Sequence, residues 1–173
     1  MGENQVSIGD RKIVLVAALI LVSGLAWWYM GARGPEEGIM VGSRAQDFTV
    51  VGLEGDSFVL AEHRGELVII DFMTTWCGPC ELQLRELEEL YDSGSGFRII
   101  SVEIDPTLRE QAFQVWATDK GFKWLVGQSP EAGRQYKVGT IPTIVVVDKE
   151  GEIVYKANFT TFEQLRSLVE QHG

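Results

Sequence analysis

The sequence Thr-Trp-Cys-Gly-Pro-Cys at residues 75–80 contains the only two cysteines of the 173-residue chain, three positions apart. An apolar run at residues 67–70, Leu-Val-Ile-Ile, precedes it and is typical of a buried strand. Residues 81–91 have the pattern of a helix, with three apolar side chains that we expect to share a buried face: Leu84, Leu87 and Tyr91. The sequence therefore predicts a strand, a tight turn and a helix whose N-terminus carries the cysteine pair.

The position of Cys77 at a helix N-terminus predicts a reactive thiol. Unpaired N–H groups and the positive end of the helix dipole stabilise a thiolate, so Cys77 is expected to ionise more readily than a free thiol. Pro79 fits the first turn of a helix, where its missing N–H costs nothing. We expect Cys77 to attack a substrate disulfide and Cys80 to resolve the mixed disulfide, so that Cys77 and Cys80 form a redox disulfide.

Other interpretations of the cysteine pair account for less of the sequence. A structural disulfide across so small a loop restricts the unfolded chain little. A zinc site needs two further ligands, but the chain has no third cysteine, and His63 and His172 lie far apart in sequence. A chance placement of the two cysteines does not explain why a predicted strand precedes them and a predicted helix follows them. The sequence thus favours redox chemistry and predicts no metal site.

Several segments resemble the active-site regions of thioredoxins. They are Trp-Cys-Gly-Pro-Cys at residues 76–80, Asp-Phe at 71–72 and Thr-Ile-Pro-Thr at 140–143, and the match covers about residues 45–173. With its apolar N-terminal segment, the chain is most similar to the membrane-anchored TlpA/ResA-like branch of the thioredoxin superfamily. This resemblance implies an α/β, thioredoxin-like fold: a mixed central sheet flanked by helices, with an N-terminal β-hairpin and an inserted helix and strand.

The order of patterns along the chain agrees with that fold. A hairpin is expected from residues 47–51 and 57–60, and a strand at 97–104 follows the active-site helix. The insertion comprises a helix from Asp105 to about Thr118 and a short strand at 123–126, with Trp116 and Trp124 interpreted as packing residues. The remaining expected elements are a short helix at 130–136, a hairpin of 143–148 and 152–155, and a last helix capped by Thr161.

The N-terminal part of the chain contains an uncharged apolar segment at residues 13–30. A helix of this length reaches about 27 Å, close to the hydrocarbon thickness of a bilayer, and Trp27 to Tyr29 suit its interface. A buried core helix and a cleaved signal peptide are the alternatives. We expect a short tail at 1–12, a transmembrane anchor at 13–30 in the lipid bilayer, a flexible linker at 31–44 and the thioredoxin-like domain at 45–173.

Charged residues beside this segment predict its orientation. Arg11 and Lys12 precede it and Arg33 follows it, which favours a cytoplasmic N-terminus and an extracytoplasmic domain; counting Arg44 as well makes the two sides equal. The family resemblance points the same way. The localisation expected is therefore a single-pass protein of the cell membrane. The net charge of −10 and the pI near 4.7 disfavour nucleic acid as a partner.

The resemblance also assigns a substrate-binding surface. It implies that Pro142 is cis and lies beside the cysteines, which leaves backbone groups of Thr140 and Ile141 free to pair with an extended substrate segment. A trans proline at a strand edge is the alternative. The residues around the cysteine pair complete the surface that we expect to contact substrate: Trp76, Gly78 and Pro79.

The proton acceptor for Cys80 is a separate question. Asp71 lies six residues before Cys77, where thioredoxins have a buried acid, and burial raises the pKa of a carboxyl. It could take the Cys80 proton, or it could have only a structural hydrogen bond. The lysine that often accompanies this acid is replaced by Ser101, and the glutamate of many TlpA-like proteins by Gln83. Which group accepts the proton is therefore left open.

These observations predict a protein-disulfide oxidoreductase without a cofactor. Gly78 and Pro79 match the reducing thioredoxins, so we expect reduction of disulfides in extracytoplasmic proteins, with cytochrome c maturation as one setting and a membrane electron donor for re-reduction. A copper chaperone, a redox binding module and a peroxiredoxin-like peroxidase are the alternatives. The peroxidase pattern Pro-x-x-x-Thr-x-x-Cys is met by Thr74 but not by Ile70.

Overall fold

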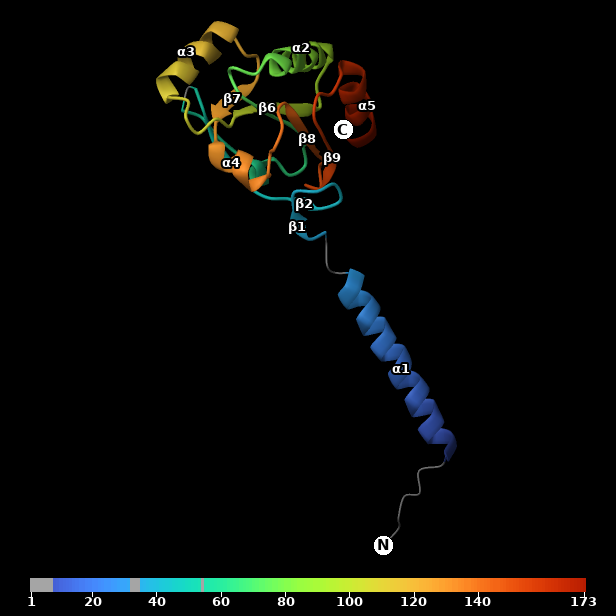
Figure 1. Cartoon of the computed structure of the whole chain (residues 1–173). Coiled ribbons are helices and arrows are strands. Elements are labelled where there is room, and N and C mark those ends of the chain that lie inside the picture. The colour runs from blue at the N-terminus through green and yellow to red at the C-terminus, as the bar shows by residue number, and fades with distance from the viewer. Residues whose placement is uncertain (1–7, 32–34, 54) are drawn as a thin grey trace. The chain divides into compact units, whose positions relative to one another are not determined.

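The computed structural model describes residues 8–31, 35–53 and 55–173, and it divides into two compact units, Met1–Glu36 and Glu37–Gly173. The first unit contains helix α1 (Ile8–Gly31), drawn in blue in Figure 1. Among the residues described, no helix combines the length and apolarity needed to cross a membrane. The transmembrane anchor at 13–30 stays a prediction, and residues 1–7 of the expected tail and Arg33 lie outside the described residues.

The second unit opens with a small strand pair. Strands β1 (Glu37–Gly38) and β2 (Arg44–Ala45) pair in parallel, and all of their residues except Ala45 fall in the range 31–44 that the sequence suggested as a linker. Met40 and Val41, in the turn between them, are exposed, whereas Ala45 is buried in the core of the domain. The compact domain therefore begins at Glu37, eight residues before the expected start.

The domain is built on a seven-stranded mixed sheet of order β4-β3-β7-β6-β5-β8-β9. Figure 1 labels four strands of this sheet, β6, β7, β8 and β9. β5 pairs in parallel with β6 and antiparallel with β8, and β6 pairs in parallel with β7. The strands are β3 (Thr49–Gly52), β4 (Ser57–Val59), β5 (Leu67–Met73), β6 (Phe97–Glu103), β7 (Leu125–Gln128), β8 (Thr143–Val147) and β9 (Ile153–Ala157). This mixed sheet is the architecture that the resemblance implied.

The insertion joins the N-terminal hairpin to the rest of the sheet. β3 and β4 form the expected hairpin, and β7 lies between β3 and β6. Helix α3 (Glu110–Lys120) precedes β7 and begins five residues later than expected, because Asp105 to Arg109 form a turn. Without β7 the hairpin has no strand to pair with in the central sheet, so the insertion completes the sheet on this side.

Both faces of the sheet are covered by apolar side chains. All seven residues of β5 are buried, as expected for a strand with both faces covered. Alternate residues beginning with Leu67 pack towards α2 (Gly78–Ser93) and α5 (Phe162–His172). Those beginning with Val68 pack in the cluster that contains Ala132 of α4 (Pro130–Gln135) and the hairpin. Asp71 lies two residues after Ile69 and therefore on the same face of the sheet as Leu67 and Ile69, which is the face covered by α2.

The buried face of α2 differs from the one expected. Its buried residues are Cys80, Gln83, Leu87 and Leu90, whereas Leu84 is half-buried and Tyr91 is 41% exposed. The buried stripe therefore includes a polar residue that apolar periodicity cannot detect. The Gln83 side chain donates to the Thr160 carbonyl at 2.9 Å and accepts the Thr160 N–H at 2.7 Å, so its burial leaves no polar atom unpaired.

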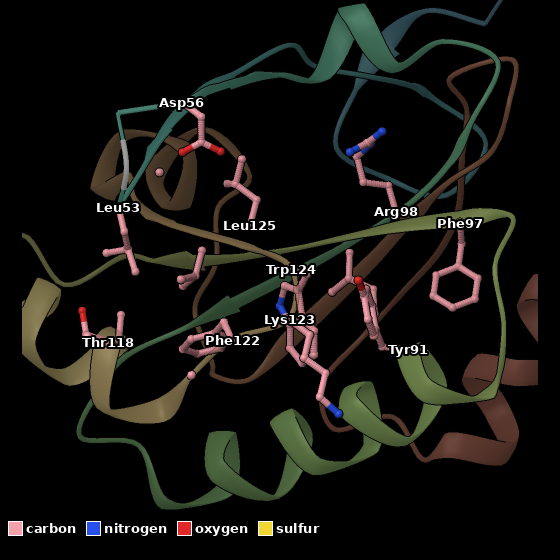
Figure 2. Close-up of a pocket in the computed structure, with 15 residues that line it drawn as sticks. Leu53, Asp56, Tyr91, Phe97, Arg98, Thr118, Phe122, Lys123, Trp124 and Leu125 are labelled. Carbon is pink, nitrogen blue, oxygen red and sulfur yellow. The ribbon is translucent and has the colours of Figure 1, made fainter.

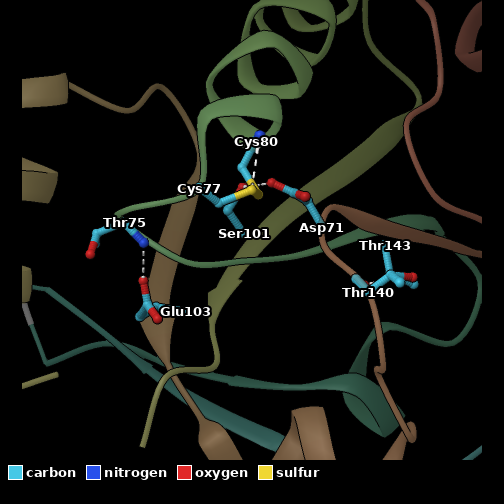
Figure 3. The surroundings of a disulfide bond; sticks show 8 residues. All are labelled: Asp71, Thr75, Cys77, Cys80, Ser101, Glu103, Thr140 and Thr143. Carbon is cyan, nitrogen blue, oxygen red and sulfur yellow. Dashed lines mark hydrogen bonds between the residues drawn. A yellow bond between two sulfur atoms is a disulfide. The ribbon is translucent and has the colours of Figure 1, made fainter. Parts of the chain in front are cut away.

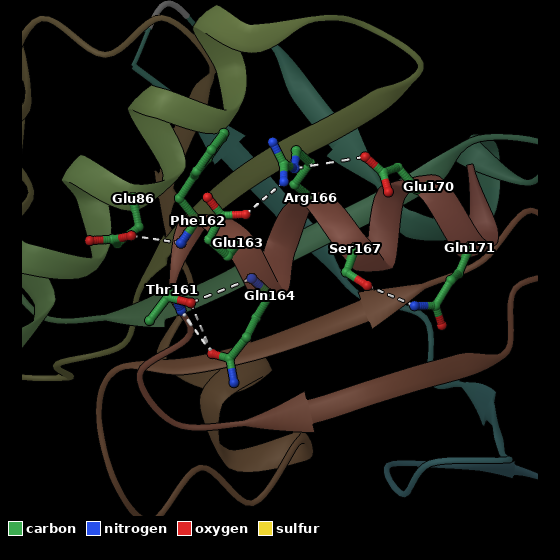
Figure 4. Close-up of polar contacts among 9 residues, drawn as sticks. All are labelled: Glu86, Thr161, Phe162, Glu163, Gln164, Arg166, Ser167, Glu170 and Gln171. Carbon is green, nitrogen blue, oxygen red and sulfur yellow. Dashed lines mark hydrogen bonds and ion pairs between the residues drawn. The ribbon is translucent and has the colours of Figure 1, made fainter.

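Helix α5 is fixed to α2 by similar contacts. Thr161 and Gln164 form a capping box at the start of α5, as expected of Thr161 (Figure 4). Glu86 of α2 accepts the Phe162 N–H at 2.6 Å. A carboxylate that accepts a hydrogen bond from an N–H group at a helix N-terminus stabilises that end of the helix. The Glu86–Phe162 contact therefore holds α5 against α2.

Candidate active site

Cys77 and Cys80 form a disulfide at the start of α2, with their Cα atoms 5.2 Å apart (Figure 3). Cys77 is the N-cap residue of the helix, and its Sγ accepts the Cys80 N–H at 3.1 Å. The Cys77 side chain is 5% exposed and that of Cys80 1%. A helix N–H directed at the Cys77 sulfur stabilises the thiolate that forms on reduction, so Cys77 is the nucleophile that this geometry supports.

Asp71 lies in β5 with its carboxyl directed towards the disulfide (Figure 3). The side chain is fully buried, and Ser101 of the paired strand donates its hydroxyl to Oδ2 at 3.0 Å. In the part of the chain that the structure describes, Oδ1 has no hydrogen-bond partner. Burial raises the pKa of the Asp71 carboxyl to about 7, although the Ser101 hydrogen bond acts in the opposite direction. Asp71 can therefore change protonation near neutral pH.

The Asp71–Ser101 contact continues to Trp124. The indole Nε1–H of Trp124 donates to Ser101 Oγ at 3.0 Å, which leaves the Ser101 hydroxyl hydrogen for Asp71. Trp124 was expected only to pack, and it also packs against Phe122 and Tyr91. These aromatic side chains line a cleft of about 780 Å³ between α2, α3, β6 and β7 (Figure 2). The wall of that cleft is thus linked to the buried acid by two hydrogen bonds.

The loop before β8 lies against the cysteines. The Ile141–Pro142 peptide bond is cis, and Ile141 packs against the cluster that contains both cysteines. The Thr140 carbonyl accepts the Thr143 hydroxyl at 2.6 Å, so this backbone group already has one partner within the molecule. The Thr140 hydroxyl donates to Asn158 at 2.9 Å. The cis proline expected from the sequence is present beside the disulfide.

The surface around the buried disulfide is exposed. The Trp76 side chain is 69% exposed, and Gly78 and Pro79 are exposed as well. The indole N–H of Trp76 donates to Asp105 Oδ2 at 2.8 Å, which fixes the ring although solvent reaches it. The structure thus places Trp76, Gly78 and Pro79 on the surface at the cysteine pair, and it packs Ile141 against the same cluster.

Gln83 is buried beneath the helix but does not serve the cysteines. Both ends of its amide are occupied by the Thr160 backbone. An amide also cannot accept a proton at physiological pH. Asp71 is therefore the nominated residue whose chemistry suits the proton transfer.

Sequence reasoning missed Glu103. This residue ends β6, is fully buried, and accepts the Thr75 N–H at 2.6 Å and the Asp105 N–H at 2.8 Å. Burial raises the pKa of its carboxyl above the ordinary value, and the two N–H bonds act against that shift. The sequence did contain a sign of this role: Glu103 is a charged residue at the end of the apolar run 97–104, and it lies two residues after Ser101 and therefore on the same face of the strand.

The histidines and acids away from the cysteines are not gathered into one cluster in the part of the chain that the structure describes. Among the described residues, no three His, Cys, Asp or Glu side chains are grouped so that they could hold a metal ion. His63 stacks on Phe58, with the ring centroids 4.5 Å apart, and lies 3.5 Å from Glu66. Its surroundings are those of a packed surface residue.

The fold and this site define a thioredoxin-like protein with a redox-type cysteine pair. The chain belongs to the AhpC/TSA family, whose model matches residues 41–156. It is 30% identical over 169 residues to the thiol-disulfide oxidoreductase ResA of Bacillus anthracis, covering 94% of this chain and 96% of the relative. It is 28% identical over 163 residues to the sporulation thiol-disulfide oxidoreductase A of Bacillus subtilis, covering 91% and 97%.

A solved structure supports the same fold. The thioredoxin domain of a thiol-disulfide oxidoreductase from Bacteroides vulgatus matches with a TM-score of 0.67 and 26% identity, over 78% of this chain and 98% of that one. The resemblance to the ResA-like branch of the thioredoxin superfamily, expected from the sequence, is therefore confirmed.

Proposed function

We propose that this protein reduces disulfides of extracytoplasmic proteins through a Cys77/Cys80 dithiol–disulfide cycle. The chain is a thiol-disulfide oxidoreductase by family and by its cysteine pair. The observation that carries the proposal is the disulfide at the N-terminus of α2, with a helix N–H on the Cys77 sulfur and a buried acid beneath it. Gly78 and Pro79 between the cysteines support the reducing direction, as in the thioredoxins that they resemble.

The cycle begins with the reduced protein. The Cys77 thiolate attacks one sulfur of the client disulfide, and the other client sulfur leaves as a thiolate that solvent protonates. Cys77 is then joined to the client by a mixed disulfide. Cys80 loses its proton and attacks Cys77 Sγ, which releases the second client sulfur. The client has gained two electrons, and Cys77 and Cys80 have lost two and formed their disulfide.

Asp71 is the proton acceptor for Cys80 in this proposal. A carboxyl with a pKa near 7 is about half ionised at neutral pH, so it can accept a proton and return it later. Its carboxyl is directed towards the sulfur pair (Figure 3). When the disulfide is reduced again, the same acid can return the proton to Cys80. This assignment favours proton transfer over a purely structural role for Asp71.

The client is held by the exposed surface around the sulfurs. Trp76, Gly78 and Pro79 give an apolar, largely backbone surface on one side. The cis-proline segment Thr140, Ile141 and Pro142 gives a second edge, where an extended client segment can pair with the backbone, although the Thr140 carbonyl already accepts the Thr143 hydroxyl. Main-chain hydrogen bonds do not depend on the side chains of the client segment, so we expect clients of varied sequence.

The location outside the cytoplasm is part of the proposal. Residues 13–30 anchor the protein in the cell membrane, with the N-terminus in the cytoplasm, as the flanking Arg11 and Lys12 favour. The alignment to ResA covers 94% of the chain, which extends beyond the thioredoxin-like domain into this segment. In this proposal a membrane electron donor reduces the Cys77–Cys80 disulfide again after each cycle. The client proteins are those whose disulfides must be reduced during cytochrome c maturation. Membrane fractionation with protease protection of the domain tests the location.

Insulin reduction by the full chain in detergent, with a thiol reductant as electron source, tests the activity. The wild-type protein is expected to accelerate the reaction, Cys77→Ser to abolish the acceleration, and Cys80→Ser to accumulate the mixed disulfide. A wild-type rate equal to that of the reductant alone would show that the proposed activity is wrong.

A further inference from the structure

The disulfide cycle does not use the buried carboxyl of Glu103. Glu103 is opposite Met73 in the parallel pairing of β6 with β5, and Met73 packs in the cluster that contains both cysteines. The carboxyl therefore lies on the same face of the sheet as the disulfide. Charged side chains are almost never fully buried unless they are paired, so a fully buried glutamate next to an active site needs an explanation.

Both carboxyl oxygens of Glu103 accept backbone N–H groups. Oε2 accepts from Thr75 at 2.6 Å (Figure 3). Oε1 accepts from Asp105 at 2.8 Å. An ionised carboxylate accepts on both oxygens, whereas a protonated one must donate from one of them. Bond lengths in this range are typical of charge-assisted hydrogen bonds. The geometry is therefore that of a buried anion.

A second carboxylate extends this contact to the next residue of the loop. Asp105 Oδ2 accepts the Trp76 indole N–H at 2.8 Å, and Oδ1 accepts the N–H and hydroxyl of Thr107 at 2.8 and 2.7 Å. Those hydrogen bonds lower the pKa of Asp105. Glu103 and Asp105 thus hold Thr75 and Trp76, the two residues immediately before Cys77.

We propose that Glu103 is a positioning residue for disulfide exchange: it fixes the Thr75–Trp76 loop, and its buried charge opposes the Cys77 thiolate, which makes the cysteine pair a stronger reductant. This inference deepens the proposed function and rests on it. Glu103 Oε2 lies 2.6 Å from the Thr75 nitrogen, and Thr75 is two residues from Cys77. With about 3.8 Å per Cα–Cα step and the length of the Cys77 side chain added, the two charges lie at most roughly 14 Å apart. At that distance, inside a protein, like charges still repel appreciably.

The direction of the effect follows from the two redox states. A thiolate exists only in the reduced state, so a neighbouring anion destabilises that state and favours the disulfide. A disulfide that is favoured in this way has a lower reduction potential; conversely, a protein whose reduced form is stabilised is a strong oxidant. The α2 N-terminus acts in the opposite sense. Two other titratable groups lie near Glu103: Asp105, and Asp71 of β5, which is two residues before the Glu103 partner Met73. On the other neighbouring strand, β7, the partner of Glu103 is the uncharged Gln128.

The test compares three full-length variants with wild type. Glu103→Gln removes the charge and keeps the shape, and Glu103→Asp keeps the charge on a shorter side chain. Glu86→Gln is the matched control, because Glu86 also accepts one backbone N–H at 2.6 Å but lies at the α2–α5 contact (Figure 4). Equilibration with glutathione or dithiothreitol buffers gives the reduction potential, and the pH profile of Cys77 alkylation gives the acidity of its thiol.

We expect Glu103→Gln to shift the equilibrium three- to tenfold towards the dithiol, which is about 15–30 mV for a two-electron couple. The midpoint of Cys77 alkylation should move to lower pH, while Glu103→Asp and Glu86→Gln stay near wild type. The proposal is overturned if Glu103→Gln leaves both quantities unchanged, or if Glu103→Asp shifts them equally. A wild-type chain without a reversible couple would instead overturn the proposed function, and this inference with it.

Asp105→Asn keeps the inference testable should Glu103→Gln fail to fold. Asp105 is half-buried, and its replacement by asparagine removes the second anion and leaves one acceptor oxygen where the carboxylate has two. The shift in potential should have the same sign and be smaller, because solvent screens this carboxylate. An unchanged or more negative potential in Asp105→Asn contradicts the proposal.

Discussion

Asp71 and Glu103 are both fully buried carboxyls on neighbouring strands beneath the cysteine pair, yet their surroundings differ. Asp71 receives one hydrogen bond, on Oδ2, and Oδ1 has no partner among the described residues. Glu103 receives a backbone N–H on each oxygen. Burial raises the pKa of both carboxyls, but only Ser101 opposes the shift at Asp71, whereas two backbone N–H groups oppose it at Glu103. Hydrogen-bond donors, and not burial alone, therefore separate the roles of the two acids.

The largest expected effect is on the stability of Asp71→Asn. The native pKa of Asp71 is about 7 and the ordinary value is 3.8, so the native state binds the proton more tightly. Wild-type stability therefore falls as the pH rises from about 4 to 7 and is level above that. Asp71→Asn does not undergo this loss and should be more stable than wild type by about 4 kcal/mol at pH 8 and by little at pH 4. Urea unfolding of the oxidised proteins at both pH values checks this, and equal stability at pH 8 would contradict it.

The same substitution should slow resolution of the mixed disulfide. Without the Asp71 carboxylate, Cys80 must lose its proton to solvent, and positioned acid–base groups contribute at least about a hundredfold. Rapid quenching with acid and mass spectrometry of a single turnover should show the mixed disulfide accumulating in Asp71→Asn at pH 7. The difference from wild type should narrow at pH 9, where hydroxide is abundant. Equal resolution rates at pH 7 would show that another group accepts the proton.

Glu103→Gln should change stability in the opposite direction. The variant loses a charged acceptor for two buried N–H groups, which costs about 1–3 kcal/mol at pH 7. Urea unfolding of the oxidised protein measures the loss, with Glu86→Gln as the partly exposed comparison. If both Asp71→Asn and Glu103→Gln raised the free energy of unfolding, the proposed difference between the two carboxyls, one destabilising and one stabilising when ionised, would be wrong.

The smallest effects concern the contacts of Asp71 with Ser101 and Trp124. Ser101→Ala removes the donor that stabilises the carboxylate, so the pKa of Asp71 should rise by about half a unit. Trp124→Phe removes the hydrogen bond to Ser101 and keeps an aromatic ring beside Tyr91 and Phe122, so it should raise the pKa of Asp71 less. Carbon-13 NMR of the Asp71 carboxyl in the oxidised protein measures both shifts. A fall in either variant would contradict the hydrogen-bond direction assigned here.

The sequence predicted the parts of the site that follow local patterns or the family motif. The apolar run before Asp71, the helix start at the cysteines, the cis Pro142 and the two hairpins are all present. Gly-Pro between the cysteines fixed the position of the nucleophile, because a proline in the first turn and an N-cap cysteine specify one local geometry.

The features that were missed depend on backbone groups brought from other segments. Gln83 is buried because the Thr160 backbone, 77 residues away, pairs with both ends of its amide. Glu103 is buried because the Thr75 N–H, 28 residues earlier, reaches it across β5. Tyr91 is 41% exposed because the buried stripe of α2 runs through Cys80, Gln83, Leu87 and Leu90. Apolar periodicity contains no information about such partners, so a polar residue at a core position is assigned to the surface.

The reduction potential of the Cys77–Cys80 pair in the full-length protein tests the central claim most directly. Equilibration with dithiol buffers at pH 7 should give one reversible two-electron transition near the value of the reducing thioredoxins, about −270 mV. A value near that of the strong oxidant DsbA, about −120 mV, or the lack of any reversible transition, would contradict the account.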